Sequence, residues 1–478
     1  MSNPQVRTRM APSPTGEYHV GHIATLLKNY AFAKQHNGSF ILRIEDTDRA
    51  RLVPGAVEKI LSVITAYGLD WDEGPVKGGP YAPYVQSERL ELYKKYAVQL
   101  VESNDAYYCT CSSDRLARVR EEQQTQKIPP KYDRHCFTNQ SEIKKQIAEG
   151  VAYVIRLRVP DNETVSFDDM IRGTIETPSS SVDDQVLLKS DGFPTYHLAV
   201  VIDDHEMKIT HVFRGEEWIS STPKHILLYK AFGWQPPVYG HIPVFLNPDG
   251  KGKMSKRKGT VSAESFLNAG YLPEALLNFF MILGWTPKDQ REILTLHEYI
   301  QEFNPASISP KSVVFDVKKL DWLNGVYIRS LPQAELIQKL NPFLPKDFPK
   351  NNLEAILPLV VDRLVTLKDI EEHTEFFYRP ITVDTTILLK RSSAAEVANQ
   401  LQKTNSVLSK IDNWNLTSIE NAVRALQATE NWDKRQYFMM LRIAITGKTA
   451  TPPLFETIVV LGKEKLLSRL QIQYSQLL

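Results

Sequence analysis

The sequence predicts an α/β protein built on a parallel sheet with helices on its faces, followed by a mainly α-helical C-terminal region. Near the N-terminus, a strand-like segment, a helical pattern and a second strand-like segment follow one another directly, which is the order of a βαβ unit. After about residue 330 the apolar residues recur mainly at helical spacing. Residues from about 95 to 190 differ in character and indicate an inserted domain.

The first strand is expected at Val6–Ala11, a short segment that two prolines end. A helix is expected from Gly21, because apolar residues then recur at helical spacing until Asn37-Gly38 ends the pattern. A second strand is expected at 40–44, directly before an acidic cluster that begins with Glu45. Ligands of parallel sheets bind beyond the carboxyl ends of the strands, so this edge is the predicted site.

The inserted stretch contains all three cysteines, a charged helical segment at 114–127 and a strand-like segment at 153–159. Sheet-like patterns resume at 196–202 and at 210–214, which predicts two further strands. A lysine-rich loop follows at 251–259. No internal repeat or low-complexity tract interrupts this order.

The composition is that of a soluble protein, with 478 residues of which 42% are hydrophobic and 24% are charged. The net charge of +1 gives no general support to nucleic-acid binding, so such a partner would have to meet local basic surfaces. No apolar run approaches the length of a membrane span, and the N-terminal residues lack a signal-peptide core. We therefore expect a cytoplasmic protein without a disulfide framework.

Residues 16–22, GEYHVGH, stand where the chain passes from a loop into the first helix. A helix N-terminus offers unpaired N–H groups and favours anions, and the imidazoles of His19 and His22 can donate to phosphate oxygens. Gly21 has no side chain, which allows a flat nucleobase to lie against the backbone. Taken alone, the same four residues also fit an ordinary helix start with incidental histidines.

The lysine-rich loop favours the phosphate interpretation. Lys253, Lys256, Arg257 and Lys258 form a cationic cluster between glycines. A solvated basic loop is the commoner origin of such a cluster. Nucleotidyl transfer, however, needs cations that follow charge as it builds on phosphates, and a loop of this kind can close over a triphosphate.

The pair of motifs, His-x-Gly-His at 19–22 and Lys-Met-Ser-Lys at 253–256, resembles the signature pair of class I aminoacyl-tRNA synthetases. The segments 11–16 (APSPTG) and 43–48 (RIEDTD) resemble the bacterial-type glutamyl-tRNA synthetases in particular. Further similar segments are DGFPTYH from 191, RGEEW from 214 and FDVKKLDWLNG from 315. The resemblance covers the chain from residue 9 to about 330.

The resemblance implies a Rossmann-like catalytic domain with an inserted acceptor-stem-binding domain and an α-helical anticodon-binding region. The expected boundaries are 1–94 and 191–250 for the catalytic halves, 95–190 for the insertion, 251–330 for the KMSKR loop and stem-contact domain, and 331–478 for the anticodon-binding region.

The implied reaction is the ATP-dependent charging of tRNA(Glu) with L-glutamate, with Mg²⁺ on the phosphates. The resemblance assigns catalysis to His19, His22, Lys253 and Lys256, with Gly21 also at the ATP. It assigns the amino acid to a second group of positions, namely Arg9, Ser13, Glu45, Tyr196 and Arg214. Two arginines suit this task, because a guanidinium fork matches the two oxygens of a carboxylate. From spacing alone, an ordinary arginine at a strand end is the favoured interpretation of each.

Cys109, Cys111 and Cys136 supply three thiols, and Tyr132 stands four residues before the last of them. From spacing alone, metal and no metal are about even, because C-x-C is tight and no fourth ligand is obvious. Some family members bind zinc through Cys-x-Cys and Tyr-x-x-x-Cys, so the resemblance implies a structural Zn²⁺ held by these four residues.

The sequence departs from the family pattern at several positions. Many bacterial members have a small or polar residue where His22 stands. Val200 occupies a place where some relatives have Asn near the glutamate, and Arg257 replaces the class-wide Ser. Thr138 stands where a few zinc-bearing relatives have His, which leaves Tyr132 as the fourth donor.

Three alternatives remain at this stage: a nucleotidyltransferase that acts on a small acid without tRNA, a truncated relative that glutamylates a modified tRNA nucleoside, and a non-catalytic tRNA-binding protein. The helical C-terminal third argues against the first two, and the paired motifs argue against the third. The sequence leaves open whether tRNA(Gln) is also charged. The family suggests a monomer.

Overall fold

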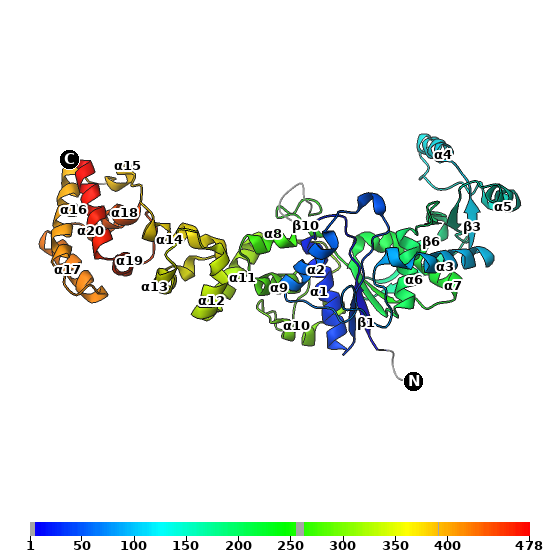
Figure 1. Ribbon diagram of the computed structural model, residues 1–478, viewed down its shortest axis with the longest axis horizontal. Helices are drawn as coiled ribbons and strands as arrows, with labels where there is room; N and C mark the ends of the chain where they lie inside the picture. The colour runs from blue at the N-terminus through cyan, green and yellow to red at the C-terminus, as the bar shows by residue number, and fades with distance from the viewer. Residues whose placement is uncertain (1–4, 255–261, 391) are drawn as a thin grey trace. The chain divides into compact units, whose positions relative to one another are not determined.

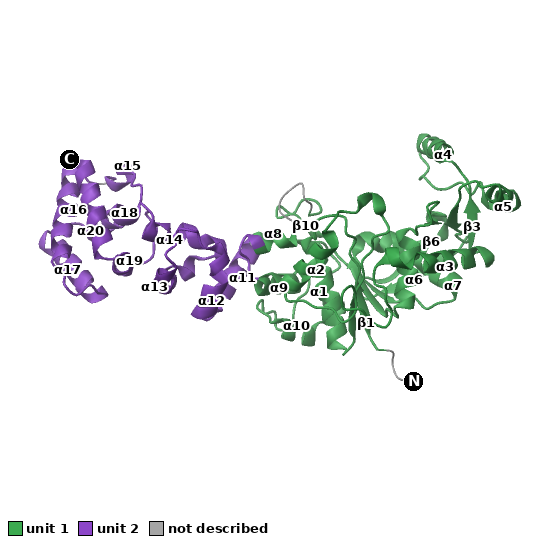
Figure 2. Cartoon of the chain, in the orientation of Figure 1, with its two compact units in different colours: residues 1–267, 273–317 green, residues 268–272, 318–478 purple. Residues whose placement is uncertain are grey.

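The computed structural model describes residues 5–254, 262–390 and 392–478. The chain divides into two compact units, residues 1–267 with 273–317 and residues 268–272 with 318–478 (Figure 2). The first unit mixes helices with parallel and antiparallel strands, whereas the described part of the second is helical. The predicted α/β architecture with a helical C-terminal region is therefore confirmed.

The first unit begins with the predicted βαβ unit. Strands β1 (Arg7–Met10) and β2 (Ser39–Leu42) pair in parallel, and helix α1 (Val20–Gln35) connects them (Figure 1). The helix buries its apolar stripe against the sheet, as its spacing predicts. On the same helix, Lys28 is fully buried and donates to the carbonyl oxygens of Ala24 and Phe280, each at 3.4 Å.

A four-stranded sheet of order β6-β5-β9-β8 lies on the other side of β1. Strand β8 (His211–Gly215) lies beside β1, where the N–H of Thr210 donates to the carbonyl of Arg7 at 2.9 Å. Strand β9 (Val238–Ile242) pairs with β8 in parallel. The hairpin of β5 (Thr164–Asp169) and β6 (Gly173–Pro178) extends this sheet, since β5 pairs in parallel with β9.

The strand predicted at 196–202 is wrong, because these residues belong to helix α6 (Tyr196–Glu206). Leu198 to Ile202 are all buried, so the run shows neither the alternation of a strand nor the one-sided stripe of a surface helix. A short apolar run cannot separate a buried helix from a buried strand. The strand predicted at 210–214 is confirmed as β8.

The inserted stretch builds a sheet of its own from three antiparallel strands, with helices around it. The elements are α3 (Leu90–Glu102), β3 (Ala106–Cys109), α4 (Ser113–Thr125), α5 (Gln140–Ala148), β4 (Val154–Leu157) and β7 (Val186–Leu188). Its hairpin β5–β6 belongs instead to the four-stranded sheet that contains β8 and β9. The predicted boundaries of 95–190 therefore enclose strands of two different sheets.

The remaining elements of the first unit cover the sheet and follow it in the chain. They are α2 (Ala56–Ala66), α7 (Thr222–Phe232), β10 (Phe245–Leu246), α8 (Ala263–Asn268), α9 (Pro273–Ile282), α10 (Leu296–Glu302) and β11 (Val313–Val314). Helix α10 begins with a capping box, in which Thr295 and Glu298 satisfy each other's backbone N–H groups.

The second unit is built from helices in the residues that the structure describes. They are α11 (Val317–Ser330), α12 (Gln333–Leu340), α13 (Leu353–Val360), α14 (Ile370–Tyr378), α15 (Thr385–Leu388), α16 (Ala394–Ser409), α17 (Leu416–Thr429), α18 (Lys434–Thr446), α19 (Leu454–Leu461) and α20 (Lys463–Leu477). The last five pack around one apolar core. Within the described ranges of both units, no helix combines the length and the apolar character that a membrane span needs.

Gly38 stands where the chain turns from α1 into β2. A Cβ atom there would lie 2.1 Å from the carbonyl oxygen of Val6, which accepts a hydrogen bond from Ser39. Gly38→Ala should therefore lower the free energy of unfolding by about 1–3 kcal/mol, because rigid backbone has to move. Chemical denaturation measures the change. Ser39→Ala is the control and should stay within about 0.5 kcal/mol, and equal stability of the two variants would contradict the prediction.

Candidate active site at the carboxyl edge of the sheet

His19 forms the N-cap of α1, as the position of the motif predicts. Its Nδ1 accepts a hydrogen bond from the N–H of Gly21 at 2.9 Å, and its carbonyl accepts from His22 at 2.9 Å. A Cβ at Gly21 would lie 3.2 Å from that Nδ1, so a side chain would crowd the turn. These hydrogen bonds hold the first turn of the helix compact, and His22 is exposed beside it.

Both ends of the lysine-rich loop lie close to this helix start. Lys253 bridges to Leu246, and the N–H of the next residue donates to the carbonyl of Phe245 at 2.7 Å. On the far side of the loop, Ser262 bridges to His19 in antiparallel fashion. His19 of the first motif therefore lies beside Ser262, which follows the lysine-rich segment in the chain. Lys256 lies outside the described residues, as do Arg257 and Lys258.

The side chain of Lys253 lies near His22 and pairs with an acid. Its Nζ is 3.2 Å from an oxygen of Glu217, and more than half of the lysine side chain is exposed. Desolvation lowers the pKa of His22, Glu217 raises it and Lys253 lowers it. The net effect lowers the pKa of His22 to about 4, so Lys253, paired with Glu217, is the cationic group here.

Arg9 lies near the carboxyl end of β1 and is buried in an ion cluster. Its guanidinium contacts both oxygens of Asp204 at 3.3 Å. Arg43, which directly follows β2 and is fully buried, contacts the same carboxylate at 2.8 Å. Burial works against ionisation here, but the two arginines lower the pKa of Asp204. The cluster therefore remains charged inside the protein.

Glu45 joins the same cluster through Arg43, at 3.0 Å. Burial raises the pKa of Glu45, and the nearby guanidinium groups of Arg43 and Arg9 oppose this rise. The N–H of Glu45 donates to the carbonyl of Pro12 at 3.0 Å, which places the loop that carries Ser13 beside it. Ser13 itself is exposed.

Arg214 lies near the end of β8 and is almost completely buried, with 5% exposure. Its hydrogen-bond partners share one property, which is that each is a neutral acceptor. They are Nε2 of His241 at 3.1 Å, the Tyr196 hydroxyl at 3.4 Å, Nδ1 of His225 at 3.3 Å and the Thr222 hydroxyl at 2.7 Å. Within the described part of the chain, no carboxylate reaches ion-pairing distance of Arg214. This buried cation is therefore solvated but lacks a direct counter-ion.

The histidines around Arg214 are held neutral. Burial lowers the pKa of His225 well below its usual range, and Arg214 lowers it further. Burial also lowers the pKa of His241, although its hydrogen bond to Asp169 opposes the effect. Neutral imidazoles can offer a lone pair to the guanidinium, which protonated ones cannot.

The structure brings Arg9, Glu45, Tyr196 and Arg214 together around one point. The Tyr196 hydroxyl accepts from Arg214 at 3.4 Å, and Asp204 and Arg43 connect Arg9 to Glu45. Tyr196 begins α6, so one helix start and the ends of three strands supply the group. Val200, one turn further along α6, is buried in the core.

Sequence reasoning missed the residues that support this group. They are Arg43, Asp169, Asp204, Thr222, His225 and His241. The signal that could have found some of them was a charged or polar residue at the end of an apolar run, such as Asp204 after 198–202. A buried charge needs a partner, but sequence alone does not say which one.

The predicted metal ligands lie together in the inserted stretch. The sulfur atoms of Cys109, Cys111 and Cys136 all lie within 4.8 Å of one another. The Tyr132 hydroxyl is 3.4 Å from the sulfurs of Cys109 and Cys111. Contact with Cys136 lowers the pKa of Cys109 most, burial opposes this, and Tyr132 and Arg156 lower it further. Three thiols and one phenol around a common centre fit a tetrahedral zinc site.

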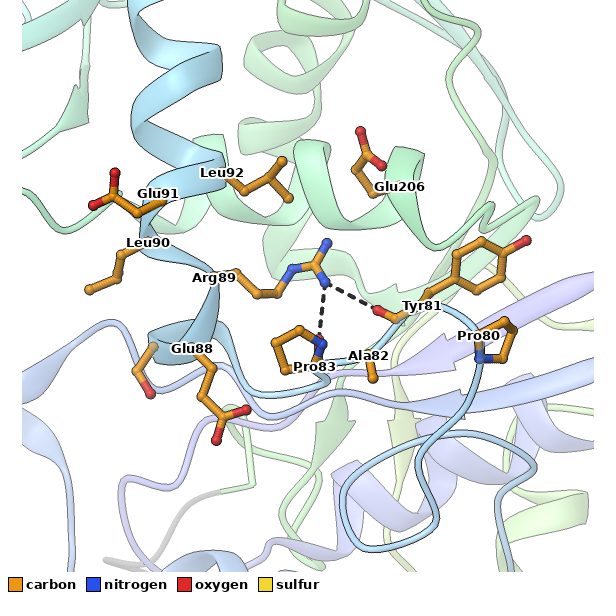
Figure 3. Close-up of a pocket in the computed structure, with 11 residues that line it drawn as sticks. Pro80, Tyr81, Ala82, Pro83, Glu88, Arg89, Leu90, Glu91, Leu92 and Glu206 are labelled. Carbon is orange, nitrogen blue, oxygen red and sulfur yellow. Dashed lines mark hydrogen bonds between the residues drawn. The ribbon is translucent and has the colours of Figure 1, made fainter.

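A separate cavity of about 530 Å³ opens beside α3 and contains none of the predicted site residues (Figure 3). Arg89 forms part of its wall and donates to the carbonyl oxygens of Tyr81 at 3.2 Å and Pro83 at 3.0 Å. The Nε of Arg89 also contacts Asp203 at 2.8 Å. This wall is thus tied to the buried ion cluster from its other side.

Two family models match the chain. Residues 5–322 match the catalytic domain of tRNA synthetases class I (E and Q). Residues 335–474 match an anticodon binding domain. The first match ends at residue 322 and the second begins at residue 335, close to the boundary between the compact units at residues 317–318.

Curated relatives match over nearly the whole chain. The glutamate–tRNA ligase of Acidothermus cellulolyticus is 46% identical over 98% of this chain and 95% of the relative. That of Dehalococcoides mccartyi is 44% identical over 99% of this chain and 98% of the relative. Among solved structures, a glutamate tRNA ligase from Elizabethkingia meningosepticum in complex with its amino acid superimposes with a TM-score of 0.91, at 34% identity over 99% of this chain and 100% of that one.

Proposed function

Because the chain belongs to the glutamate–tRNA ligases, which are class I aminoacyl-tRNA synthetases, we propose that it charges tRNA(Glu) with L-glutamate at the expense of ATP. The α-carboxylate of glutamate attacks the α-phosphorus of ATP and gives glutamyl-adenylate and pyrophosphate. The terminal ribose hydroxyl of the tRNA then attacks the adenylate. Neither step uses a protein nucleophile, so positioning and charge stabilisation carry the catalysis.

ATP binds at the start of α1 in this proposal. His19, Gly21 and His22 form one wall, with the helix N-terminus directed at the phosphates. Lys253 and Lys256 are assigned the role of stabilising charge on the phosphates together with Mg²⁺. The support for this arrangement is the bridge between Ser262 and the N-cap residue, and the position of Lys253 near His22.

One observation carries the assignment of the amino acid: Arg214 is a buried cation whose partners are all neutral acceptors. Burial of a charge without a counter-ion is costly. The side-chain carboxylate of glutamate supplies that counter-ion and fits the guanidinium fork. Arg9 already pairs with Asp204, so it has less electrostatic reason than Arg214 to bind the side-chain carboxylate of glutamate.

The other predicted contacts follow from the same placement. The carboxylate of Glu45 receives the ammonium group of the substrate, and the Tyr196 hydroxyl and Arg9 contact its carboxylate. Ser13 hydrogen-bonds to the substrate from the loop after β1. The support is that Arg214 contacts the Tyr196 hydroxyl, that Arg9 and Glu45 belong to one buried ion cluster, and that the N–H of Glu45 donates to the carbonyl of Pro12, the residue before Ser13.

Arg214→Ala should raise the KM for glutamate steeply while leaving the KM for ATP nearly unchanged. Truncating one partner of a buried charge pair costs about 2–5 kcal/mol, which corresponds to a KM increase of roughly 30-fold or more. Steady-state charging of tRNA(Glu) at varied glutamate measures it. Arg291→Ala removes a partly exposed arginine that pairs with Asp289, Glu298 and Glu302, and it serves as the control. An unchanged glutamate KM in Arg214→Ala would remove Arg214 from the pocket.

In this proposal, two different regions of the chain contact the tRNA. The inserted stretch binds the acceptor stem, and the helical region from 331 to 478 reads the anticodon. The anticodon-domain match supports this and disfavours both a tRNA-independent nucleotidyltransferase and a truncated enzyme that modifies a nucleoside. We further propose a monomer that works in the cytoplasm.

The function is tested directly by charging assays with purified transcripts. The chain should esterify glutamate to tRNA(Glu) with ATP, and glutamine should not replace glutamate, because its amide turns an N–H toward the guanidinium. Parallel assays with tRNA(Gln) determine whether this tRNA is also charged. Failure to charge tRNA(Glu) would overturn the proposed function.

We also propose a structural Zn²⁺ bound by Cys109, Cys111, Cys136 and Tyr132. Soft thiolates are preferred zinc ligands, and four protein donors leave no open position for chemistry. The ion would hold the start of α4 and the segment before α5 to strand β3. The convergence of the three sulfurs within 4.8 Å supports the proposal.

Protein purified without chelator should contain about one zinc ion per chain by elemental analysis. Cys136→Ser should lose most of this zinc and lower the melting temperature, because the metal contributes folding energy. His135→Ala changes an exposed neighbour that is not part of the cluster, so its zinc content should stay unchanged. A zinc content near zero in the unmodified protein would return the cysteines to an ordinary packing role.

A further inference from the structure

We propose that Asp169 and His241 are positioning residues, which hold the guanidinium of Arg214 in the orientation that receives the side-chain carboxylate of glutamate. The inference rests on the proposed function of Arg214. It adds two residues that touch neither the substrate nor ATP. They act through Arg214, and their effect should therefore appear in the affinity for glutamate.

The three residues form a continuous buried chain of hydrogen bonds. Asp169 ends β5, and its Oδ2 lies 2.6 Å from Nδ1 of His241 on β9. The Nε2 of the same imidazole lies 3.1 Å from Nε of Arg214 on β8. The side chains of Asp169 and His241 are both 0% exposed. Water therefore does not compete for any of these contacts.

The chemistry of the partners fixes where the imidazole proton lies. Burial raises the pKa of Asp169, but hydrogen bonds from His241 and from the N–H of Ile171 outweigh it, so the carboxyl stays ionised. A carboxylate can only accept, which places the proton of His241 on Nδ1. Nε2 is then a lone-pair acceptor, as the N–H of Arg214 requires.

The other neutral tautomer of His241, with its proton on Nε2, could not accept a hydrogen bond from Arg214. Nε2 of His241 also lies 3.2 Å from the hydroxyl of Thr222, which donates to the carbonyl of Trp218 and accepts from Arg214. An imidazole protonated at Nε2 would donate to Thr222 and turn an N–H against Arg214 Nε. The guanidinium would lose one of the contacts that define its plane. Asp169 is the group that prevents this.

The position of Asp169 is itself fixed by the turn of the β5–β6 hairpin. Its Oδ1 accepts from the N–H groups of Ile171 and Arg172 at 3.0 and 3.1 Å. Its carboxylate also accepts from the N–H of His241 at 3.0 Å. Arg172 donates to the carbonyl of His241 at 3.2 Å and pairs with Glu216. The turn is thus hydrogen-bonded to β9 at His241, the residue that contacts Arg214.

The first test is Asp169→Asn, which keeps the size of the side chain and removes its charge. The backbone N–H groups at the turn hold the amide oxygen on one side, so the amide NH₂ faces His241 and favours the Nε2-protonated tautomer. The KM for glutamate in tRNA(Glu) charging should rise about tenfold or more, which is the scale of losing one hydrogen bond to a charged group. The KM values for ATP and tRNA should change little.

The matched control is Asp168→Asn on the same strand. Asp168 is exposed and accepts from the Thr174 hydroxyl, so the substitution makes the same charge change without touching β9. Its glutamate KM should equal that of the unmodified chain. Arg214→Ala is measured in the same assay, so that failure of the positioning role is distinguished from failure of the glutamate assignment itself.

Two substitutions of His241 separate the two bonds of the imidazole and serve if Asp169→Asn folds poorly. His241→Gln places an acceptor near the former Nε2 and can still hold Arg214, whereas His241→Asn reaches only toward Asp169. The glutamate KM should rise about tenfold in His241→Asn and clearly less in His241→Gln. Asp169→Asn should add little in the His241→Gln background, because the tautomer no longer matters.

The proposal is overturned if Arg214→Ala raises the glutamate KM but Asp169→Asn and His241→Asn do not. It is also overturned if these variants raise the KM values for glutamate, ATP and tRNA alike, since that pattern indicates a general loss of structure. If Arg214→Ala leaves the glutamate KM unchanged, the glutamate assignment fails and the positioning role falls with it.

Discussion

The fully buried guanidinium of Arg43 is the interaction on which the geometry of the site depends. It contacts Asp204 at 2.8 Å, Glu45 at 3.0 Å and Asp203 at 3.6 Å, and so joins the end of β2 to helix α6. Removing one member of such a cluster leaves an uncompensated charge, which costs about 3–5 kcal/mol. Because α6 begins with Tyr196, the same cluster also sets where the start of that helix stands relative to the strand ends.

The site contains two kinds of arginine environment. Arg9 and Arg43 are neutralised by carboxylates of the protein, whereas Arg214 is surrounded by hydroxyl groups and neutral imidazoles. Only the second kind has electrostatic reason to take an anion from solution. An amide in place of the carboxylate would leave the charge unbalanced and set donor against donor, which is a strong basis for rejection. In the proposed function, selectivity for glutamate over glutamine therefore comes both from the positive charge of Arg214 and from the absence of a protein carboxylate paired with it among the described residues.

Local signals in the sequence predicted much of the fold but less of the site. The β1–α1–β2 unit followed from helical spacing and from the break at Asn37-Gly38, which act within a few residues. The helix at Tyr196–Glu206 was mistaken for a strand, because a completely buried run carries no periodic signal. The predicted site positions were placed by resemblance to a family. The support behind them could not be found, because residues 169, 214 and 241 are joined by sheet register, which sequence spacing does not encode.

That register also bears on how the inserted stretch relates to the site. The stretch builds its own sheet, β3–β4–β7, which ends at Cys109 on β3, yet its hairpin hydrogen-bonds to β9 of the four-stranded sheet that carries Arg214. A boundary drawn by composition assigns the hairpin to the insertion, whereas one drawn by hydrogen bonds assigns it to the site. The second boundary is the physical one for Asp169, because its carboxylate contacts the backbone and side chain of His241. The insertion thus contributes to the surroundings of Arg214 through β5, and to the cysteine cluster through β3 and the segments after it.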